Sequence, residues 1–374
     1  MRVFTIRGTL VAELDALPDA LPKTGFVWIA FARDEFKQQL ALVQATLQKL
    51  CGIQLVDLHV SDLLNRQLPS HYDYTSQYDL LVFRRLAAGR GDAASTIEQA
   101  AGDTQAIPAR RGGPPVLRRV DTSPVGFAVF DQVLLTVHPD DCAVRDAFAA
   151  RLLQAAASEA RESSLVRLPA SPADLMLRVV NQMVDGFLEL RRELTRQIDH
   201  WQTELLNPRT RFHNWSTLLD VRMGLHHLDE ICEDQRAAIQ DWTDALEGWP
   251  EADTPAEQRE RDLLAVRSRD VLEHIERVVH HVRRLEQSAE TAVQMHFSAQ
   301  GNRTNDIMRT LTALTAVFLP LNLIAGIFGM NFEFIPLIHR QGGFWWAMGS
   351  MTVTAVVLIA YFWRKRYLVS REGR

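Results

Sequence analysis

The sequence predicts an α+β domain, then a long stalk helix and two C-terminal transmembrane helices. Three observations support this fold class. Short runs rich in β-branched and aromatic residues recur through the first 137 residues. A helical pattern free of proline runs from residue 256 to residue 319. Two segments without any charged residue, Thr310–Phe332 and Gly342–Trp363, follow it near the C-terminus.

Residues 1–165 are predicted to form a cytoplasmic α/β domain. The candidate strands are Val3–Ile6, Phe26–Phe31, Leu80–Phe83, Phe127–Phe130 and Val133–Val137. Helical patterns at Phe36–Leu50 and Arg145–Ala157 lie between and after these strands. The stretch Gly89–Pro115 is rich in Gly, Ala, Arg and Pro, and we interpret it as a long loop. It lacks the glycine and lysine spacing of a phosphate-binding loop.

Residues 166–306 are predicted to form a cytoplasmic helical stalk. Helices are expected over residues 173–206 and 216–247, each ending where proline or glycine follows. A third helix over residues 257–328 would be roughly 100 Å long. Its apolar positions recur at steps of three and four: Val271, Ile275, Val278, Val282, Leu285, Ala289 and Ala292. One small domain cannot bury so long a stripe, so the helix needs partners from its own chain and from other copies.

The membrane spans are predicted at residues 307–330 and 342–363, joined by an extracytoplasmic loop at residues 331–341. The two uncharged runs contain 23 and 22 residues, and about 20 residues cross a bilayer as a helix. A basic cytoplasmic tail, residues 364–374, places Arg364, Lys365 and Arg366 directly after the second span. The positive-inside rule therefore puts the C-terminus in the cytoplasm, and two spans put the N-terminus there too.

One face of the first span combines polar and small residues. Steps of three and four along it give Asn305, Met308, Thr312, Thr315, Leu319, Asn322, Gly326 and Gly329. An asparagine at mid-depth is costly on a surface that faces lipid. Rings of oxygen atoms around a symmetry axis would instead suit a hard, partly hydrated cation. The alternative is that these residues only pack helices together, and the stripe alone leaves both interpretations open.

Other residue patterns give little support for an enzyme. The three cysteines are far apart, and there is no Cys-x-x-Cys motif. The neighbouring histidines His226-His227 and His280-His281 cannot face one another on a helix. The runs Thr310–Phe332 and Gly342–Trp363 contain no charged residue, which argues against a proton-coupled carrier with a carboxylate inside the membrane. We expect neither an enzymatic activity nor a nucleic-acid partner.

The triplet Gly329-Met330-Asn331 stands at the end of the first span. It is flanked by Asn302-Arg303-Thr304-Asn305, by Leu319-Pro320-Leu321 and Ile324-Ala325-Gly326-Ile327, and by Phe332-Glu333-Phe334. With these flanks, and with an α/β domain, a stalk and a basic tail in that order, the sequence resembles the CorA family of divalent-cation channels. This family belongs to a two-span superfamily that also includes ZntB.

The resemblance implies a homopentameric funnel in a bacterial inner membrane, with the first span lining a central pore. It implies that Gly329, Met330 and Asn331 form the selectivity entrance, where Asn331 binds the hydrated ion. Positions that resemble pore-lining ones are Asn305, Met308, Leu319, Asn322 and Gly326, to which the polar stripe adds Thr312 and Thr315. The implied activity is Mg²⁺ influx driven by the membrane potential and closed by cytoplasmic Mg²⁺. Co²⁺ and Ni²⁺ are further candidate ions.

Two carboxylates are candidate metal-binding groups. Asp270 matches the stalk carboxylate of the regulatory Mg²⁺ site in this family, and no motif identifies its partner. A solvated carboxylate beside Arg269 is the alternative interpretation. Glu333 is expected to attract cations at the outer mouth. However, Ile335-Pro336-Leu337 lacks the second acid usual in the family, and Arg340 follows, which weakens that attraction. A Zn²⁺ transporter of the ZntB type therefore remains the alternative function.

Overall fold

The computed structural model describes residues 1–86, 122–159, 168–206, 215–250, 252–330 and 342–365. The chain divides into two compact units. The first contains Met1–Thr203 and Phe212–Glu290, and the second contains Glu204–Arg211 and Thr291–Arg374. The sheet and its covering helices therefore belong to the first unit, and the most apolar helical segments belong to the second.

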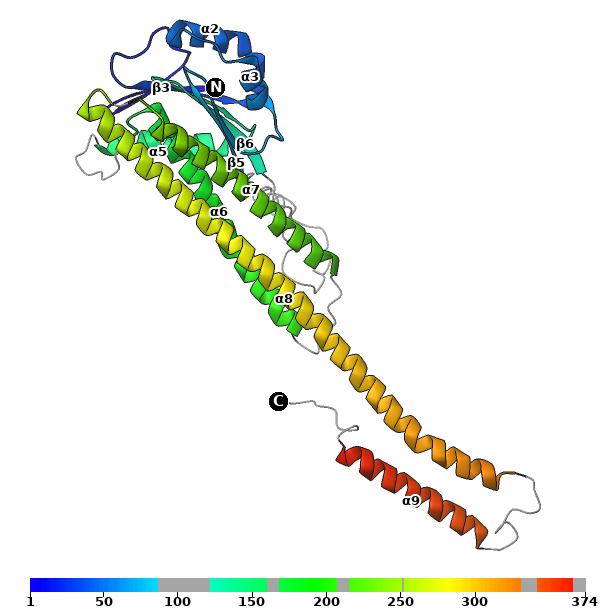
Figure 1. Ribbon diagram of the computed structural model, residues 1–374. Coiled ribbons are helices and arrows are strands. Elements are labelled where there is room, and N and C mark those ends of the chain that lie inside the picture. The colour runs from blue at the N-terminus through cyan, green and yellow to red at the C-terminus, as the bar shows by residue number, and fades with distance from the viewer. Residues whose placement is uncertain (87–121, 160–167, 207–214, 251, 331–341, 366–374) are drawn as a thin grey trace. The chain divides into compact units, whose positions relative to one another are not determined.

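A seven-stranded mixed sheet forms the centre of the first unit (Figure 1). Its strands are β1 (Arg2–Arg7), β2 (Leu10–Leu14), β3 (Phe26–Ala32), β4 (His71–Tyr74), β5 (Asp79–Leu86), β6 (Thr122–Val129) and β7 (Val133–His138). Their order is β2-β1-β3-β7-β6-β5-β4. Among these strands, β3 and β7 are parallel and all other neighbours are antiparallel. The parallel pair thus joins two antiparallel halves into one sheet.

Three short helices cover one face of the sheet: α1 (Arg33–Gln38), α2 (Leu40–Cys51) and α3 (Asp57–Leu64). Side chains alternate between the two faces of a strand, so Val27, Ile29 and Phe31 of β3 point to this side. They are buried in one cluster with Leu47 of α2 and Leu63 of α3. This apolar layer fixes α1, α2 and α3 on the sheet.

The opposite face of the sheet is buried around Trp28 and covered in part by α5 (Ala143–Glu159). The Trp28 ring stacks on Phe4 with a centroid distance of 5.0 Å and meets Phe148 of α5 edge-on at 6.0 Å. Its indole N–H donates to Thr136 Oγ1 over 2.9 Å. Because both faces are buried, the central strands read as nearly continuous apolar runs.

Three long helices complete the first unit: α6 (Pro172–Leu206), α7 (Trp215–Glu247) and the first part of α8 (Pro255–Phe328). Trp242 of α7 donates its indole N–H to Ser268 Oγ of α8 over 3.0 Å. Thr195 Oγ1 of α6 lies 2.7 Å from His281 Nε2 of α8. These contacts place the three helices against one another in the first unit (Figure 1).

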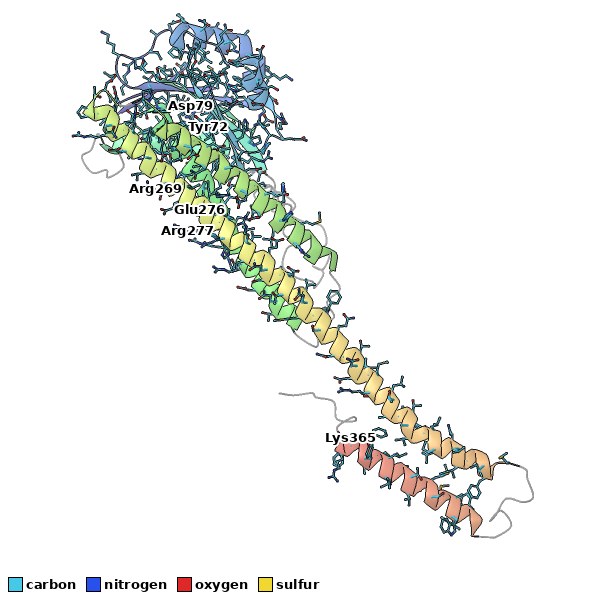
Figure 2. All side chains as sticks on the ribbon, in the orientation of Figure 1. Tyr72, Asp79, Arg269, Glu276, Arg277 and Lys365 are labelled. Carbon is cyan, nitrogen blue, oxygen red and sulfur yellow. The ribbon has the colours of Figure 1, made fainter. Side chains whose placement is uncertain are left out.

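The second unit contains the end of α8 and α9 (Gly343–Arg364), and both helices are long and apolar enough to cross a membrane. In each helix, 6% of the most apolar 18-residue window is buried, whereas a core helix of a globular domain would be mostly covered. Lys365 follows α9 directly, and its Nζ lies 5.2 Å from the centre of the Tyr361 ring (Figure 2). The long, uncovered apolar surfaces fit helices that face lipid or other helices.

The five predicted strands and the predicted long helices are confirmed. The helical pattern predicted at Phe36–Leu50 is confirmed, although the structure divides it at Gln39 into α1 and α2. Strands β2 and β4 were not predicted, since both are short, half-exposed edge strands without an apolar run. The predicted loop at Gly89–Pro115 lies outside the described residues.

Candidate functional site: a polar helix face and a stalk carboxylate

The predicted pore-lining residues lie on one continuous helix, α8, and the structure leaves all of them exposed. They are Asn305, Met308, Thr312, Thr315, Leu319, Asn322 and Gly326. Met308 is 61% exposed and Leu319 is 70% exposed. Phe318 and Leu323 on other faces of the helix are also exposed. The chain therefore covers neither the polar stripe nor the apolar faces, and both are open to lipid or to other copies.

The two threonines of the stripe donate their hydroxyl protons back to their own helix. Thr312 Oγ1 donates to the carbonyl of Met308 over 2.7 Å, and Thr315 Oγ1 donates to the carbonyl of Leu311 over 2.9 Å. Each hydroxyl oxygen then keeps lone pairs that can accept further hydrogen bonds. The stripe can thus present acceptors to the water shell of a cation, even within a dry membrane.

Pro320 lies inside α8, between the two polar parts of the stripe. Proline has no backbone N–H, so the carbonyl four residues earlier, at Ala316, loses its helical donor. An unpaired carbonyl at membrane depth is tolerated where it faces water or other protein groups. This break in the hydrogen-bond ladder places a further polar group one to two turns from Asn322.

The predicted selectivity entrance begins where α8 ends, at Phe328. The backbone N–H of Gly329 donates to the carbonyl of Ala325 over 2.9 Å, and Met330 continues the turn to the carbonyl of Ile327. A Cβ at Gly329 would lie 3.1 Å from the Ala325 carbonyl oxygen. A side chain at this position would therefore be in tight contact with the turn that precedes it. Asn331 and Glu333 lie outside the described residues.

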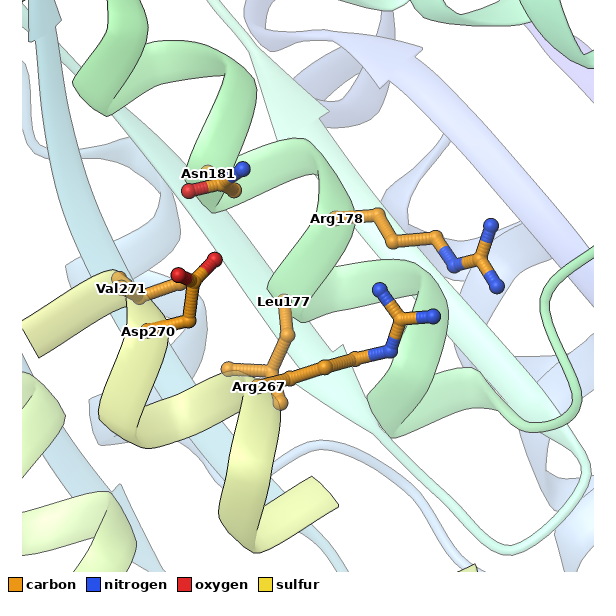
Figure 3. Close-up of a pocket in the computed structure, with 6 residues that line it drawn as sticks. All are labelled: Leu177, Arg178, Asn181, Arg267, Asp270 and Val271. Atoms are coloured by element: carbon orange, nitrogen blue, oxygen red, sulfur yellow. The ribbon is translucent and has the colours of Figure 1, made fainter. Parts of the chain in front are cut away.

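Asp270 is on the part of α8 that belongs to the first unit, far from the stripe in sequence, and its side chain is 57% exposed. It lines a cavity of about 90 Å³ together with Leu177, Arg178, Asn181, Arg267 and Val271 (Figure 3). Its Oδ1 lies 3.7 Å from His274 Nε2, one turn along the helix. His274 Nδ1 in turn lies 3.2 Å from Asn181 Oδ1 on α6. The carboxylate thus stands at the seam between α6 and α8.

A second carboxylate, Asp174, lies beside this cavity but is buried, with 1% of its side chain exposed. Its Oδ1 is 2.5 Å from Arg267 Nε, and its Oδ2 is 3.2 Å from an Arg178 guanidinium nitrogen. The backbone N–H of Ala170 donates to Asp174 Oδ2 over 3.0 Å. Burial lowers the pKa of Arg267, and the charge of Asp174 opposes that shift. Asp174 therefore ties α6 to α8 through a charged cluster.

The donor set around Asp270 suits a hard cation but is incomplete within one chain. Its carboxylate and the amide oxygen of Asn181 are oxygen donors of the kind that Mg²⁺ takes. Among the described residues, no three His, Cys, Asp or Glu side chains come together as a metal site. A cation held at Asp270 would need further oxygen ligands from water or from another copy of the chain.

Sequence reasoning identified Asp270 but missed its neighbours Asp174, Asn181 and Arg267. These residues come from two helices about 90 positions apart, and no local spacing connects them. The signal that could have been used was Asp174 in the first turn of a predicted helix, four residues before Arg178. That spacing indicates an ion pair on one helix face, but it does not predict that Arg267 joins it.

The chain matches the family model described as "CorA-like Mg2+ transporter protein" over residues 108–366, which is more than half of its 374 residues. It is 25% identical over 194 residues to the cobalt/magnesium transport protein CorA of Thermotoga maritima, covering 52% of each chain. It is 33% identical over 101 residues to the magnesium transport protein CorA of Haemophilus influenzae, covering 27% of this chain and 32% of that protein. These alignments span about half or less of the relatives' length.

Two solved structures share the fold over nearly the whole chain. The CorA magnesium transporter of Methanocaldococcus jannaschii superposes with a TM-score of 0.68 at 17% identity, covering 97% of this chain and 98% of that one. The full-length CmaX protein superposes with a TM-score of 0.63 at 16% identity, covering 98% and 97%. At these identities the likeness shows the fold alone. The matching model describes transporters, in agreement with the expectation that the chain is not an enzyme.

Proposed function

Because the chain belongs to the CorA-like Mg²⁺ transporter family, we propose that it is a membrane channel that admits Mg²⁺ into the cytoplasm, driven by the membrane potential. The observation that carries this proposal is the polar face of α8. Asn322 and two threonines stand in an uncharged span, on a helix that ends at the Gly-Met-Asn triplet. Co²⁺ and Ni²⁺ are further candidate substrates, and the name of one relative mentions cobalt.

The proposed pore is lined by the α8 stripe of several copies around one axis, and we propose five copies. Mg²⁺ gives up its water shell reluctantly, so oxygen acceptors that bind the shell serve it better than direct ligands. Thr312 and Thr315 supply such acceptors, because each donates its hydroxyl proton to a carbonyl of its own helix and keeps its oxygen lone pairs. Met308 and Leu319 would form apolar rings that close the pore by excluding water. Asn331 would bind the hydrated ion at the entrance, with Gly329 and Met330 shaping the turn before it.

Regulation is proposed at Asp270. Its carboxylate would hold a cytoplasmic Mg²⁺ together with oxygen ligands from a neighbouring copy, and the bound ion would neutralise carboxylates that otherwise repel one another. The fractional exposure of Asp270 supports this role, because a side chain that its own chain leaves 57% exposed is open to a second copy. An Asp270→Ala channel is expected to keep conducting at high cytoplasmic Mg²⁺.

Two alternatives remain open. A Zn²⁺ transporter of the ZntB type would use the same scaffold with a different ion preference; the missing second acid after Glu333 leaves the choice of metal open, while Phe332-Glu333-Phe334 favours the CorA branch. The second alternative, from another class, is a membrane-tethered signalling or structural protein whose spans only anchor it. An anchor would have no use for polar side chains at mid-depth, which cost free energy in lipid.

The test is Mg²⁺ flux into liposomes that contain the purified full chain, with Zn²⁺ and Co²⁺ as competitors. We expect Mg²⁺ uptake by the parent protein and little or none by Asn331→Ala. Phe318→Leu, a change on the apolar side of the same span, is the matched control and should conduct normally. Uptake of Zn²⁺ without Mg²⁺ would move the chain to the ZntB alternative. If folded, oligomeric protein transports neither ion, the proposal that the chain is a channel is wrong.

A further inference from the structure

Arg267 and Asp270 stand three positions apart on α8, a spacing at which opposite charges commonly pair on one helix face. Both side chains line the same cavity. Arg267 nevertheless pairs with Asp174 of α6, with Nε 2.5 Å from Oδ1. Figure 3 shows the Arg267 side chain extending away from Asp270 and toward Arg178. The pairing of Arg267 is therefore decided by a residue on another helix.

We propose that Asp174 is a positioning residue, which holds Arg267 away from Asp270 and so keeps the Asp270 carboxylate open to a divalent cation. This inference rests on the proposed function, in which Asp270 binds the regulatory Mg²⁺. The inference adds that Mg²⁺ binding at Asp270 depends on Asp174, a buried carboxylate that does not contact the ion.

Burial explains why Arg267 prefers Asp174. Asp174 is 1% exposed and Asp270 is 57% exposed. A buried carboxylate that loses its cationic partner is left uncompensated in a low-dielectric environment, whereas an exposed carboxylate is stabilised by water. The backbone N–H of Ala170 fixes the orientation of Asp174 further. Arg267 therefore pairs with the buried carboxylate of Asp174 rather than with the exposed carboxylate of Asp270.

The charges around the cavity predict that loss of the Asp174 charge weakens cation binding at Asp270. Asp174 and Asp270 contribute two negative charges, and Arg178 and Arg267 contribute two positive charges, so the cluster is neutral. Removing the charge of Asp174 would leave two guanidinium groups beside one carboxylate, a net charge of +1. Arg267 would then be free to pair with Asp270, and a divalent cation would have to displace it.

Asp174 also has an ordinary structural role, because its carboxylate accepts the backbone N–H of Ala170 just before α6 and joins α6 to α8. The experiment must separate that role from positioning. Two double variants do so: Asp174→Asn with Arg178→Gln, and Asp174→Asn with Arg267→Gln. Both change the same carboxylate to an amide and have the same net charge. They differ only in which arginine remains, and Arg178 is also held by the carbonyl of Leu168 at 3.3 Å.

The measurement is the dissociation constant of Mg²⁺ for the full chain in detergent, by isothermal titration calorimetry. We expect the variant that keeps Arg267 to bind Mg²⁺ about fivefold more weakly than the variant that keeps Arg178, as for competition by a half-exposed ion pair. Arg267→Gln alone should bind at least as tightly as the parent. Asp174→Asn combined with Arg269→Gln, which removes a different nearby arginine, should not recover the affinity.

Equal affinity in the two double variants would overturn the positioning role, because a purely structural Asp174 affects both alike. An Asp270→Ala variant separates this result from failure of the proposed function. If Asp270→Ala binds Mg²⁺ like the parent, Asp270 is not a ligand, and the proposed regulation falls together with the inference. If Asp270→Ala loses binding while the two double variants match, only the role of Asp174 is overturned. Thermal unfolding of each variant verifies that it is folded.

Discussion

At the scale of single residues, His138 is a fully buried histidine at the end of β7. Its Nε2 lies 2.9 Å from Thr136 Oγ1, which also accepts the indole N–H of Trp28. A neutral ring fits this arrangement, because Nε2 can accept the hydroxyl proton of Thr136. Burial, followed by the charges of Arg145 and Arg85, lowers the pKa of His138 to about 3.

This depressed pKa predicts an acid-sensitive domain. In the folded chain His138 stays neutral down to about pH 3, while in the unfolded chain it takes up a proton below about pH 6.5. The unfolded state therefore binds more protons, and the free energy of unfolding falls by about 1.4 kcal/mol between pH 7.5 and 5.5. Chemical denaturation followed by tryptophan fluorescence at the two pH values measures this loss.

The control for that measurement is a surface histidine. His138→Gln should remove about 1.4 kcal/mol of the pH dependence. His227→Gln, at an exposed position on α7, should leave it unchanged. A His138→Gln protein with the pH dependence of the parent would show that His138 is not the group responsible.

At the scale of elements, Trp242 holds α7 to both the sheet and α8. The side chain is fully buried. Its ring meets Tyr72 of β4 edge-on at 5.9 Å, and its indole N–H donates to Ser268 of α8 over 3.0 Å. Gln235 adds a hydrogen bond from α7 to the carbonyl of Arg84 on β5. One side chain thus connects three elements that are distant in sequence.

Two substitutions at this position separate packing from hydrogen bonding. Trp242→Ala should cost about 3–5 kcal/mol of unfolding free energy, since it leaves a large cavity between the elements. Trp242→Phe keeps much of the contact area and should cost nearer 1–3 kcal/mol, because the Ser268 hydroxyl loses its donor. Denaturant titrations of the two variants test this. Similar losses in both would mean that packing at Trp242 contributes little.

Most elements of this fold were predictable because their periodicity is local. The strands around Trp28 and Leu134 are apolar runs bounded by turn residues, and α8 keeps its helical pattern without proline up to Pro320. The break at Gln39 was not predictable, since its apolar pattern continues on both sides. Strands β2 and β4 take their conformation from their neighbours β1 and β5 rather than from their own residues.

The candidate site was predictable only where it follows one helix. The stripe from Asn305 to Gly326 can be read from spacing alone, and the structure places it on one unbroken helix. The surroundings of Asp270 were not predictable, because Asp174 and Asn181 reach it from α6. Contacts between helices depend on register and crossing, which no local pattern specifies.

At the scale of the whole molecule, charge is distributed unevenly around the two apolar helices. Arg364 ends α9 and Lys365 follows it, with further basic residues in the tail, whereas Gly342 and Gly343 begin α9 without a charge. The positive-inside rule therefore predicts Lys365 in the cytoplasm and Gly342 on the other side. This predicted topology would keep the first unit on the cytoplasmic side.

Cysteine labelling tests this topology. In a Cys51→Ser background, Gly342→Cys and Lys365→Cys are each exposed to a maleimide reagent that does not cross membranes. We expect label at position 342 in intact spheroplasts, and at position 365 only after permeabilisation. The remaining cysteines, Cys142 and Cys232, are buried and should contribute little background. Labelling of position 365 in intact spheroplasts would show that the topology is the opposite of the predicted one.

The parallel pairing of β3 with β7 also sets an order of events during synthesis. The sheet cannot close until β7, which ends at His138, has left the ribosome. The uncharged run of the first span begins 172 residues later, at Thr310 (310 − 138 = 172). At about 5–20 residues per second, that interval lasts roughly 10–35 s. All strands of the domain thus leave the ribosome well before the first apolar span does. The sheet can therefore fold before the nascent chain is inserted into the membrane.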